Sequence, residues 1–203
     1  MKKGLVPPLL MLALWLGVLS WWTSGFSAFT TFSYTLKAAG PLPRATPRFD
    51  IRDQFGVARN LGDFRGRYVL LQFTYLSCGD VCPLAMADFY RVHEALAGRQ
   101  AAELMLLTVS FDPRRDSTER LLASWQHYGR PADWTFAALT APLDEQSQAE
   151  LRRLGVWVSR RDGDLYNHSA QAFLIDTAGQ VVQVFTGPGN SGAVIAALQE
   201  RLT

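Results

Sequence analysis

The strongest constraint on the fold is a cysteine pair that closely follows an apolar run. The run is YVLLQFTY, residues 68–75, and it leads to Cys78 and Cys82, with Pro83 immediately after. An apolar run of this length is typical of a buried strand, and proline is favoured in the first turn of a helix. The pattern therefore predicts a strand, a short loop that carries Cys78, and a helix that begins near Cys82.

The rest of the chain alternates between strand and helix patterns. Further strands are predicted at 104–111 and 135–139, with hairpins at 49–59, 156–166 (tip 160–164) and 172–185, and helices at 83–98, 117–128, 144–154 and 191–202. This alternation predicts one α/β domain with a mixed central sheet flanked by helices. A cysteine pair between the first long strand and a helix is the arrangement of thioredoxin-like folds.

The N-terminus carries an uncharged run of 18 residues, 5–22, preceded by Lys2 and Lys3. That length is just sufficient to cross a bilayer as a helix, and the basic flank predicts that the domain is exported. We expect a transmembrane anchor at 1–24, a linker at 25–47 and a thioredoxin-like domain at 48–203. A cleaved signal peptide is the alternative. The expected location is the bacterial inner membrane, single pass, with the C-terminal domain in the periplasm.

Composition excludes several classes of protein. A hydrophobic content of 48% argues against disorder, and two cysteines are too few for a disulfide-dense scaffold. With Lys2 and Lys3 set aside, 18 basic residues balance 18 acidic ones. A formally neutral domain without a basic patch has no electrostatic footprint for nucleic acid, so we expect no nucleic-acid binding.

The spacing of Cys78 and Cys82 allows two kinds of chemistry. At a helix N-terminus the macrodipole and free amides are expected to stabilise thiolates and lower the thiol pKa. Two such sulfurs can hold one soft metal ion or close into a Cys78–Cys82 disulfide. A purely structural disulfide is the plainer interpretation, but so short a loop gains little stability from it. A redox or metal role is therefore favoured.

Two sulfurs alone do not complete a tetrahedral zinc site, whereas two thiolates with one imidazole suit copper, as Cu(I) or Cu(II). Three histidines are available. His93 lies among apolar residues at helical spacing and is expected to pack, and His127 is explained by its place at a helix C-terminus. His168 lies in a loop before a strand, and this placement by itself favours a ligand role only modestly.

Three segments together resemble the Sco/SenC family. They are FTYLSCGDVCP at 73–83, SFDPRRD at 110–116, and HSA followed by FLID between 168 and 176. DFRGR at 63–67 also fits the family's lead-in to the first long strand. The similarity covers about residues 48–187.

The resemblance implies a thioredoxin-like fold that binds copper through Cys78, Cys82 and His168. It also implies a role in maturing the binuclear copper centre of cytochrome c oxidase subunit II. The sequence departs from the family pattern at Gly79, where proline is usual, and at Ser77 and Asn167, where histidine and aspartate are common. None of these three is a ligand, so copper binding is still expected.

Two functions remain open. The first is a membrane-tethered copper chaperone, not an enzyme, that passes copper to oxidase subunit II by ligand exchange. The second is a periplasmic thiol–disulfide reductase that keeps the oxidase copper-site cysteines reduced, with Cys78 and Cys82 as the reactive pair. Other copper chaperones or thioredoxin-like reductants are possible further partners. A peroxidase and a pure interaction domain are weaker alternatives.

Overall fold

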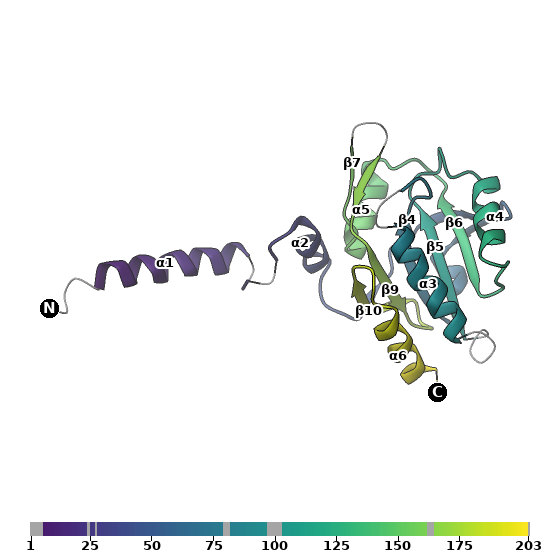
Figure 1. Ribbon diagram of the computed structural model, residues 1–203. Coiled ribbons are helices and arrows are strands. Elements are labelled where there is room, and N and C mark those ends of the chain that lie inside the picture. Colours follow the sequence, from purple (N-terminus) through teal and green to yellow (C-terminus); the bar gives the residue numbers. More distant parts are fainter. Residues whose placement is uncertain are drawn as a thin grey trace.

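The computed structural model describes residues 6–23, 25–26, 28–78, 82–96, 103–161 and 165–202. A mixed sheet forms the centre of the domain (Figure 1). Its strands, in spatial order, are β1 (Arg44–Ala45), β10 (Gln180–Thr186), β9 (Gln171–Ile175), β4 (Tyr68–Thr74), β5 (Leu104–Ser110), β6 (Trp134–Leu139), β2 (Asp50–Asp53) and β3 (Ala58–Asn60). This confirms the predicted α/β domain with a mixed sheet.

The central strands β4, β5 and β6 run parallel, with Tyr68 opposite Leu104 and Leu106 opposite Trp134. Every residue of β5 is buried, and in β4 only Tyr68 is not. This burial explains the nearly continuous apolar runs in the sequence, because a parallel strand covered on both faces alternates little. The predicted strand at 68–75 is therefore confirmed, one residue shorter.

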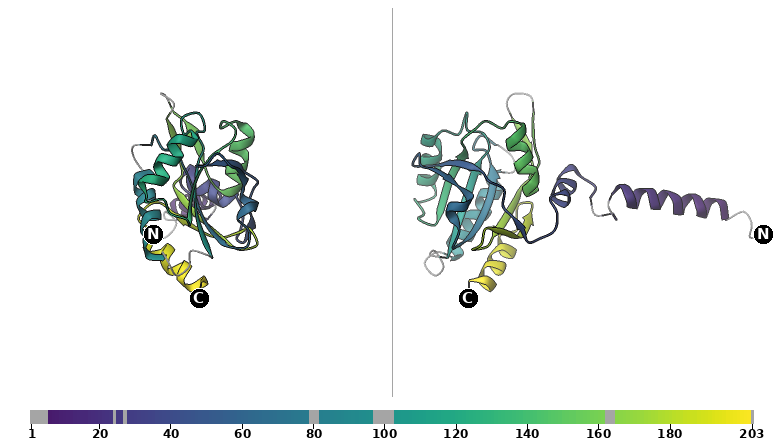
Figure 2. Two further views of the ribbon diagram at one scale, coloured as in Figure 1. Left: turned by 90° about the vertical axis from the view of Figure 1, so that its right-hand side faces the viewer. Right: turned by 180° about the vertical axis from the view of Figure 1, so that it is seen from behind.

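Helices cover both faces of this sheet. The face formed by Leu70, Leu106 and Phe136 packs against α3 (Cys82–Leu96), α4 (Thr118–His127) and α6 (Ser191–Arg201). The opposite face packs against α5 (Glu145–Leu154) and the short helix η1 (Leu61–Phe64). The two further views in Figure 2 show these layers from the side and from behind.

A separate two-stranded sheet, β7 (Val158–Arg160) and β8 (Tyr166–His168), projects from one end of the domain (Figure 1). The strands are antiparallel, with Val158 opposite His168, as the predicted hairpin requires. Of its expected tip at 160–164, residues 162–164 lie outside the described residues, as does the expected end of the first helix near Gly98.

The expected linker at 25–47 differs from the structure. It contains α2 (Thr31–Ala38) and β1, which pairs with β10. Helix α2 has a capping box at Thr30 and Ser33, and the ring of Phe32 packs edge-on against Trp157 with centroids 5.2 Å apart. The Phe32–Trp157 contact and the pairing of β1 with β10 attach part of the segment to the domain. The folded part therefore begins before residue 48.

The N-terminal helix α1 (Val6–Trp22) lies apart from the sheet and buries none of its residues (Figure 1). It has 17 residues. In the described part of the chain, no helix combines the length and the apolar character that membrane crossing requires.

Candidate metal centre

Three segments of the fold meet at the C-terminal end of β4. The strand ends at Thr74, and residues 75–78 form a turn in which the Cys78 amide donates to the Tyr75 carbonyl at 3.2 Å. Cys82 begins α3, and His168 ends β8. A crevice beyond the C-terminal ends of parallel strands is where α/β proteins commonly place binding sites.

The structure brings together the three residues predicted as ligands. The sulfurs of Cys78 and Cys82 and an imidazole nitrogen of His168 lie within 4.8 Å of one another. The Cys82 Sγ to His168 Nε2 distance is 3.3 Å. Neither Cys78 nor Cys82 takes part in a disulfide bond. Gly79, one of the departures from the family pattern, lies outside the described residues.

The ring of His168 is oriented for ligation. Its Nδ1 lies 3.1 Å from the Ser169 carbonyl oxygen, so the proton belongs on Nδ1 and the Nε2 lone pair faces the sulfurs. The ring lies edge-on to Tyr75 and Phe111, with centroid distances of 5.9 and 5.2 Å. Burial lowers the pKa of His168 below its ordinary value of 6.5, so the imidazole is neutral at pH 7.

The two thiols differ in their surroundings. Cys78 is half-buried, whereas Cys82 is 5% exposed. Burial, with the neighbouring Cys78 thiol as a smaller cause, raises the pKa of Cys82 to about 12. The expectation that the helix N-terminus lowers the thiol pKa is therefore wrong for Cys82, because loss of hydration of the thiolate outweighs the helix dipole. Without a metal ion, Cys82 holds its proton at neutral pH.

The other candidate residues lie outside the group. His93 pairs with Asp133 at 3.0 Å, as expected of a packing residue. His127 is in the last turn of α4, as predicted. Met86, whose thioether is a further possible copper ligand one helical turn after Cys82, is buried, and its sulfur accepts a hydrogen bond from Gln72 at 3.2 Å, so it packs in the core and is not part of the group.

An open groove of about 440 Å³ lies between α3 and α4 beside the cysteines. Its lining includes Cys78, Pro83, Arg120 and His127. It gives a partner protein access to the exposed side of Cys78, while His168 does not line it.

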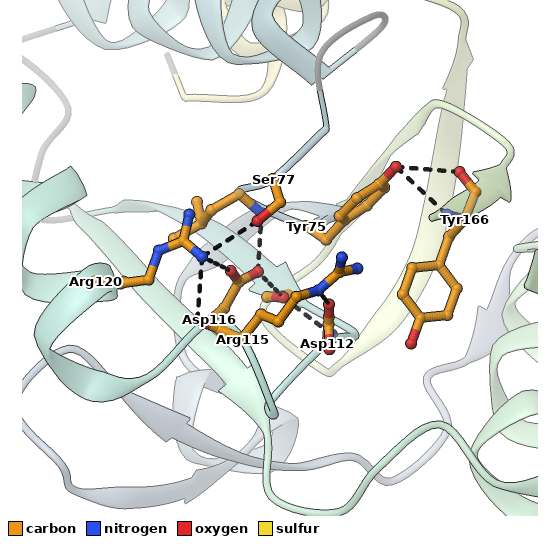
Figure 3. A network of polar contacts seen from close by, with 9 residues as sticks. Tyr75, Ser77, Asp112, Arg115, Asp116, Arg120 and Tyr166 are labelled. Atoms are coloured by element: carbon orange, nitrogen blue, oxygen red, sulfur yellow. Dashed lines mark hydrogen bonds and ion pairs between the residues drawn. The ribbon is translucent and has the colours of Figure 1, made fainter. Parts of the chain in front are cut away.

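The surroundings of the group include residues that the sequence did not single out (Figure 3). Tyr75 and Tyr166 face each other edge-on at 5.4 Å, and the guanidinium of Arg115 lies 5.7 Å from each ring. Asp116 and Arg120 lie beneath the turn that carries Cys78. The segment 110–116 was noted only as part of the family resemblance, and no role was assigned to its residues; its two aspartates were the available signal.

Comparison with known proteins was consistent with this geometry. A family model described as SCO1/SenC matches residues 38–203. A putative copper-binding protein of Stutzerimonas stutzeri is 27% identical over 145 residues, which cover 70% of this chain and 69% of that protein.

Solved structures share the fold. Bradyrhizobium japonicum ScoI with copper bound superposes with a TM-score of 0.63 at 23% identity, covering 78% of this chain and 99% of that one. BsSco, described as a member of the Sco family of cytochrome c oxidase assembly proteins, gives a TM-score of 0.65 at 19% identity, covering 80% and 96%. The fold is therefore thioredoxin-like, with a mixed sheet flanked by helices.

Proposed function

Because the chain belongs to the SCO1/SenC family, we propose that it is a copper chaperone that acts in cytochrome c oxidase assembly. The observation that carries the proposal is the convergence of two cysteine sulfurs and one imidazole nitrogen within 4.8 Å. Soft thiolates hold Cu(I), and the imidazole supports Cu(II). Copper is the cargo in this proposal, and subunit II of the oxidase, with its binuclear copper centre, is the acceptor.

The unequal exposure of the ligands suggests an order of transfer. Cys78 and Cys82 both line the open groove, but Cys78 is half-buried whereas Cys82 is only 5% exposed, and His168 does not line the groove. An acceptor thiolate entering the groove replaces Cys78 on the copper ion first. Cys82 and His168 hold the ion until further acceptor ligands arrive, so the ion is never released to solvent.

Copper loading tests the proposal directly. The reduced full-length chain in detergent should bind close to one Cu(I) per chain and release at least one proton, that of Cys82. Because the pKa of Cys82 is about 12, each proton displaced lowers the apparent affinity about tenfold per unit decrease in pH near neutrality. Competition titrations at pH 7 and pH 8 measure this dependence. The proposal fails if binding is far below one ion per chain, or is independent of pH.

The difference in burial between Cys78 and Cys82 also favours a second function. A half-buried Cys78 beside a buried Cys82 suits thiol–disulfide exchange. The Cys78 thiolate would attack an acceptor disulfide, forming a mixed disulfide and releasing one acceptor thiolate. Cys82 would then attack Cys78, release the second acceptor thiol and leave a Cys78–Cys82 disulfide. Two electrons pass to the acceptor, and a thioredoxin-like reductant restores the pair. His168 has no task in this reaction.

We also propose that residues 1–24 attach the domain to the bacterial inner membrane, with the domain in the periplasm. The uncharged helix α1, which buries none of its residues, and the two preceding lysines support this proposal. In fractionated cells the full-length chain should sediment with membranes and be digested by protease added from the periplasmic side. Recovery as a shortened soluble form would instead indicate a cleaved signal peptide.

A further inference from the structure

The turn after β5 carries a polar network that copper ligation itself does not use (Figure 3). Asp112 and Asp116 are 3% and 2% exposed. The Asp116 amide donates to the Asp112 carbonyl at 3.0 Å, and the side chain of Asp112 pairs with Arg115. The turn is thus held by its own backbone and by an ion pair, which leaves the Asp116 carboxylate for other partners.

Asp116 holds the residue two positions before Cys78. One of its oxygens, Oδ2, accepts the Leu76 amide at 2.8 Å and the hydroxyl of Ser110. The Leu76 amide thereby has a buried, charged acceptor. Hydrogen bonds to charged groups are stronger than neutral ones, and loss of a buried acceptor leaves the donor unsatisfied.

Arg120 holds the residue directly before Cys78. Its Nη1 lies 3.2 Å from the Ser77 hydroxyl oxygen and 3.2 Å from the Arg115 carbonyl oxygen. It also lies 3.5 Å from Asp116 Oδ1, which has no hydrogen-bond partner within the described residues. The two residues that precede Cys78, Leu76 and Ser77, are therefore both hydrogen-bonded to one ion pair, Asp116 and Arg120.

The same turn also touches the histidine side of the group. The Arg115 guanidinium lies over the rings of Tyr75 and Tyr166, at 5.7 Å from each centroid. Tyr75 begins the turn that ends at Cys78, and Tyr166 is two residues before His168 on β8. One segment therefore contacts both the cysteine loop and the histidine strand.

We propose that Asp116 and Arg120 are positioning residues that fix Cys78 relative to Cys82 and His168. This inference rests on the proposed function, because it assigns a purpose to the geometry of a copper site. A three-ligand site gains affinity when its ligands are held in place before the ion arrives. The Asp116–Arg120 pair holds the Cys78 turn in this way without touching the ion.

The experiment separates positioning from simple stabilisation by using matched variants of the full-length chain. Asp116→Asn and Arg120→Gln disturb the pair, and the half-exposed Arg120 side chain makes the second variant tolerable for folding. Asp53→Asn is the control for a buried carboxylate: Asp53 is 2% exposed and accepts two backbone amides at 2.9 Å in the β2–β3 hairpin. Arg114→Gln is the control for the exposed cation, since Arg114 lies in the same turn.

Three quantities are measured for each variant: the melting temperature, the thiolate-to-Cu(II) charge-transfer absorption, and hydrogen exchange of the Leu76 amide in the reduced, metal-free chain. We expect Asp116→Asn and Arg120→Gln to shift the absorption band and to lower Cu(II) affinity about tenfold or more, the range seen for groups that orient metal ligands. Leu76 should exchange faster in Asp116→Asn. We expect Asp53→Asn to lower the melting temperature and to leave the charge-transfer band unchanged. We expect Arg114→Gln to change neither the melting temperature nor the band.

The inference is overturned if both disturbing variants keep the native band and affinity, or if Asp53→Asn moves the band as much as Asp116→Asn does. A native chain that binds no copper would refute the proposed function instead. In that event the Leu76 amide decides the inference, because faster exchange in Asp116→Asn but not in Asp53→Asn supports positioning, and unchanged exchange excludes it.

Discussion

Replacement of either cysteine by serine should lower the affinity of the reduced chain for Cu(I) by about 1,000-fold. Both sulfurs belong to the three-residue group, and a hydroxyl is a poor ligand for a soft ion. Structural zinc sites in small peptides are worth about 10–16 kcal/mol, so by analogy one ligand of a small site accounts for about 4 kcal/mol. That free energy corresponds to about a 1,000-fold change in affinity. Competition against a Cu(I) chelator measures it for Cys78→Ser and Cys82→Ser.

The matched control is Met86→Leu, which removes another sulfur beside the groove. Because the Met86 sulfur serves the core through Gln72, this variant should bind Cu(I) with nearly native affinity. Cys82 is buried, so Cys82→Ala serves as a second variant if the serine hydroxyl disturbs folding. Affinity within tenfold of the native chain in any folded cysteine variant would contradict the assigned site.

Replacement of His168 by alanine should distinguish a chaperone from a reductase. The variant loses the imidazole whose Nε2 faces Cys82 Sγ at 3.3 Å. We expect Cu(II) affinity to fall at least about 100-fold, and Cu(I) affinity to fall much less, because two thiolates still hold the softer ion. His127→Ala is the control, since His127 lines the groove but is not part of the ligand group. It should keep native affinity for both ions.

The same variants in cells decide between the two functions. Under limiting copper, a chaperone requires all three ligands, so cells with Cys78→Ser, Cys82→Ser or His168→Ala should lack oxidase activity. A reductase requires only the cysteines. Normal oxidase activity with His168→Ala, together with loss of activity in both cysteine variants, would favour the reductase and exclude copper delivery as the essential role.

The sequence was informative where local pattern and tertiary environment agree. The buried strands β4 and β5 were predictable because apolar runs of seven or eight residues have few alternatives. Cys78 and Cys82 were identified by their place after β4. His168 lies 86 positions beyond Cys82, and only the resemblance of three separated segments connected it to them.

The pKa of Cys82 could not be predicted from the sequence. The helix N-terminus is a local feature, and it favours the thiolate. The burial that opposes it comes from distant segments, since Cys82 belongs to a core cluster with Phe111 and Phe173. The protonation state of Cys82 is therefore decided by its tertiary environment, which favours the thiol, whereas the helix N-terminus favours the thiolate.

The role of the segment 110–120 could not be predicted from the sequence either, because two aspartates and three arginines near a strand end are typical of many solvated turns. What distinguishes Asp116 is its burial and its bond to the Leu76 amide, 40 positions away. Contacts of that range depend on the parallel pairing of β4 with β5, which places their C-terminal ends side by side.

The packing of α2 and β1 on the domain limits the distance between helix α1 and the group formed by Cys78, Cys82 and His168. Had residues 25–47 formed an extended tether, the domain could have moved up to about 80 Å from the end of the N-terminal helix. With α2 docked, only residues 23–30 separate the two helices, which limits the span to about 28 Å. In a membrane-attached chain, this short connection keeps the domain in a thin layer above the bilayer, so it can meet acceptors only there. Confinement raises the local concentration of membrane-bound acceptors relative to soluble ones. The choice of acceptor therefore depends partly on how far above the bilayer the acceptor's copper site lies.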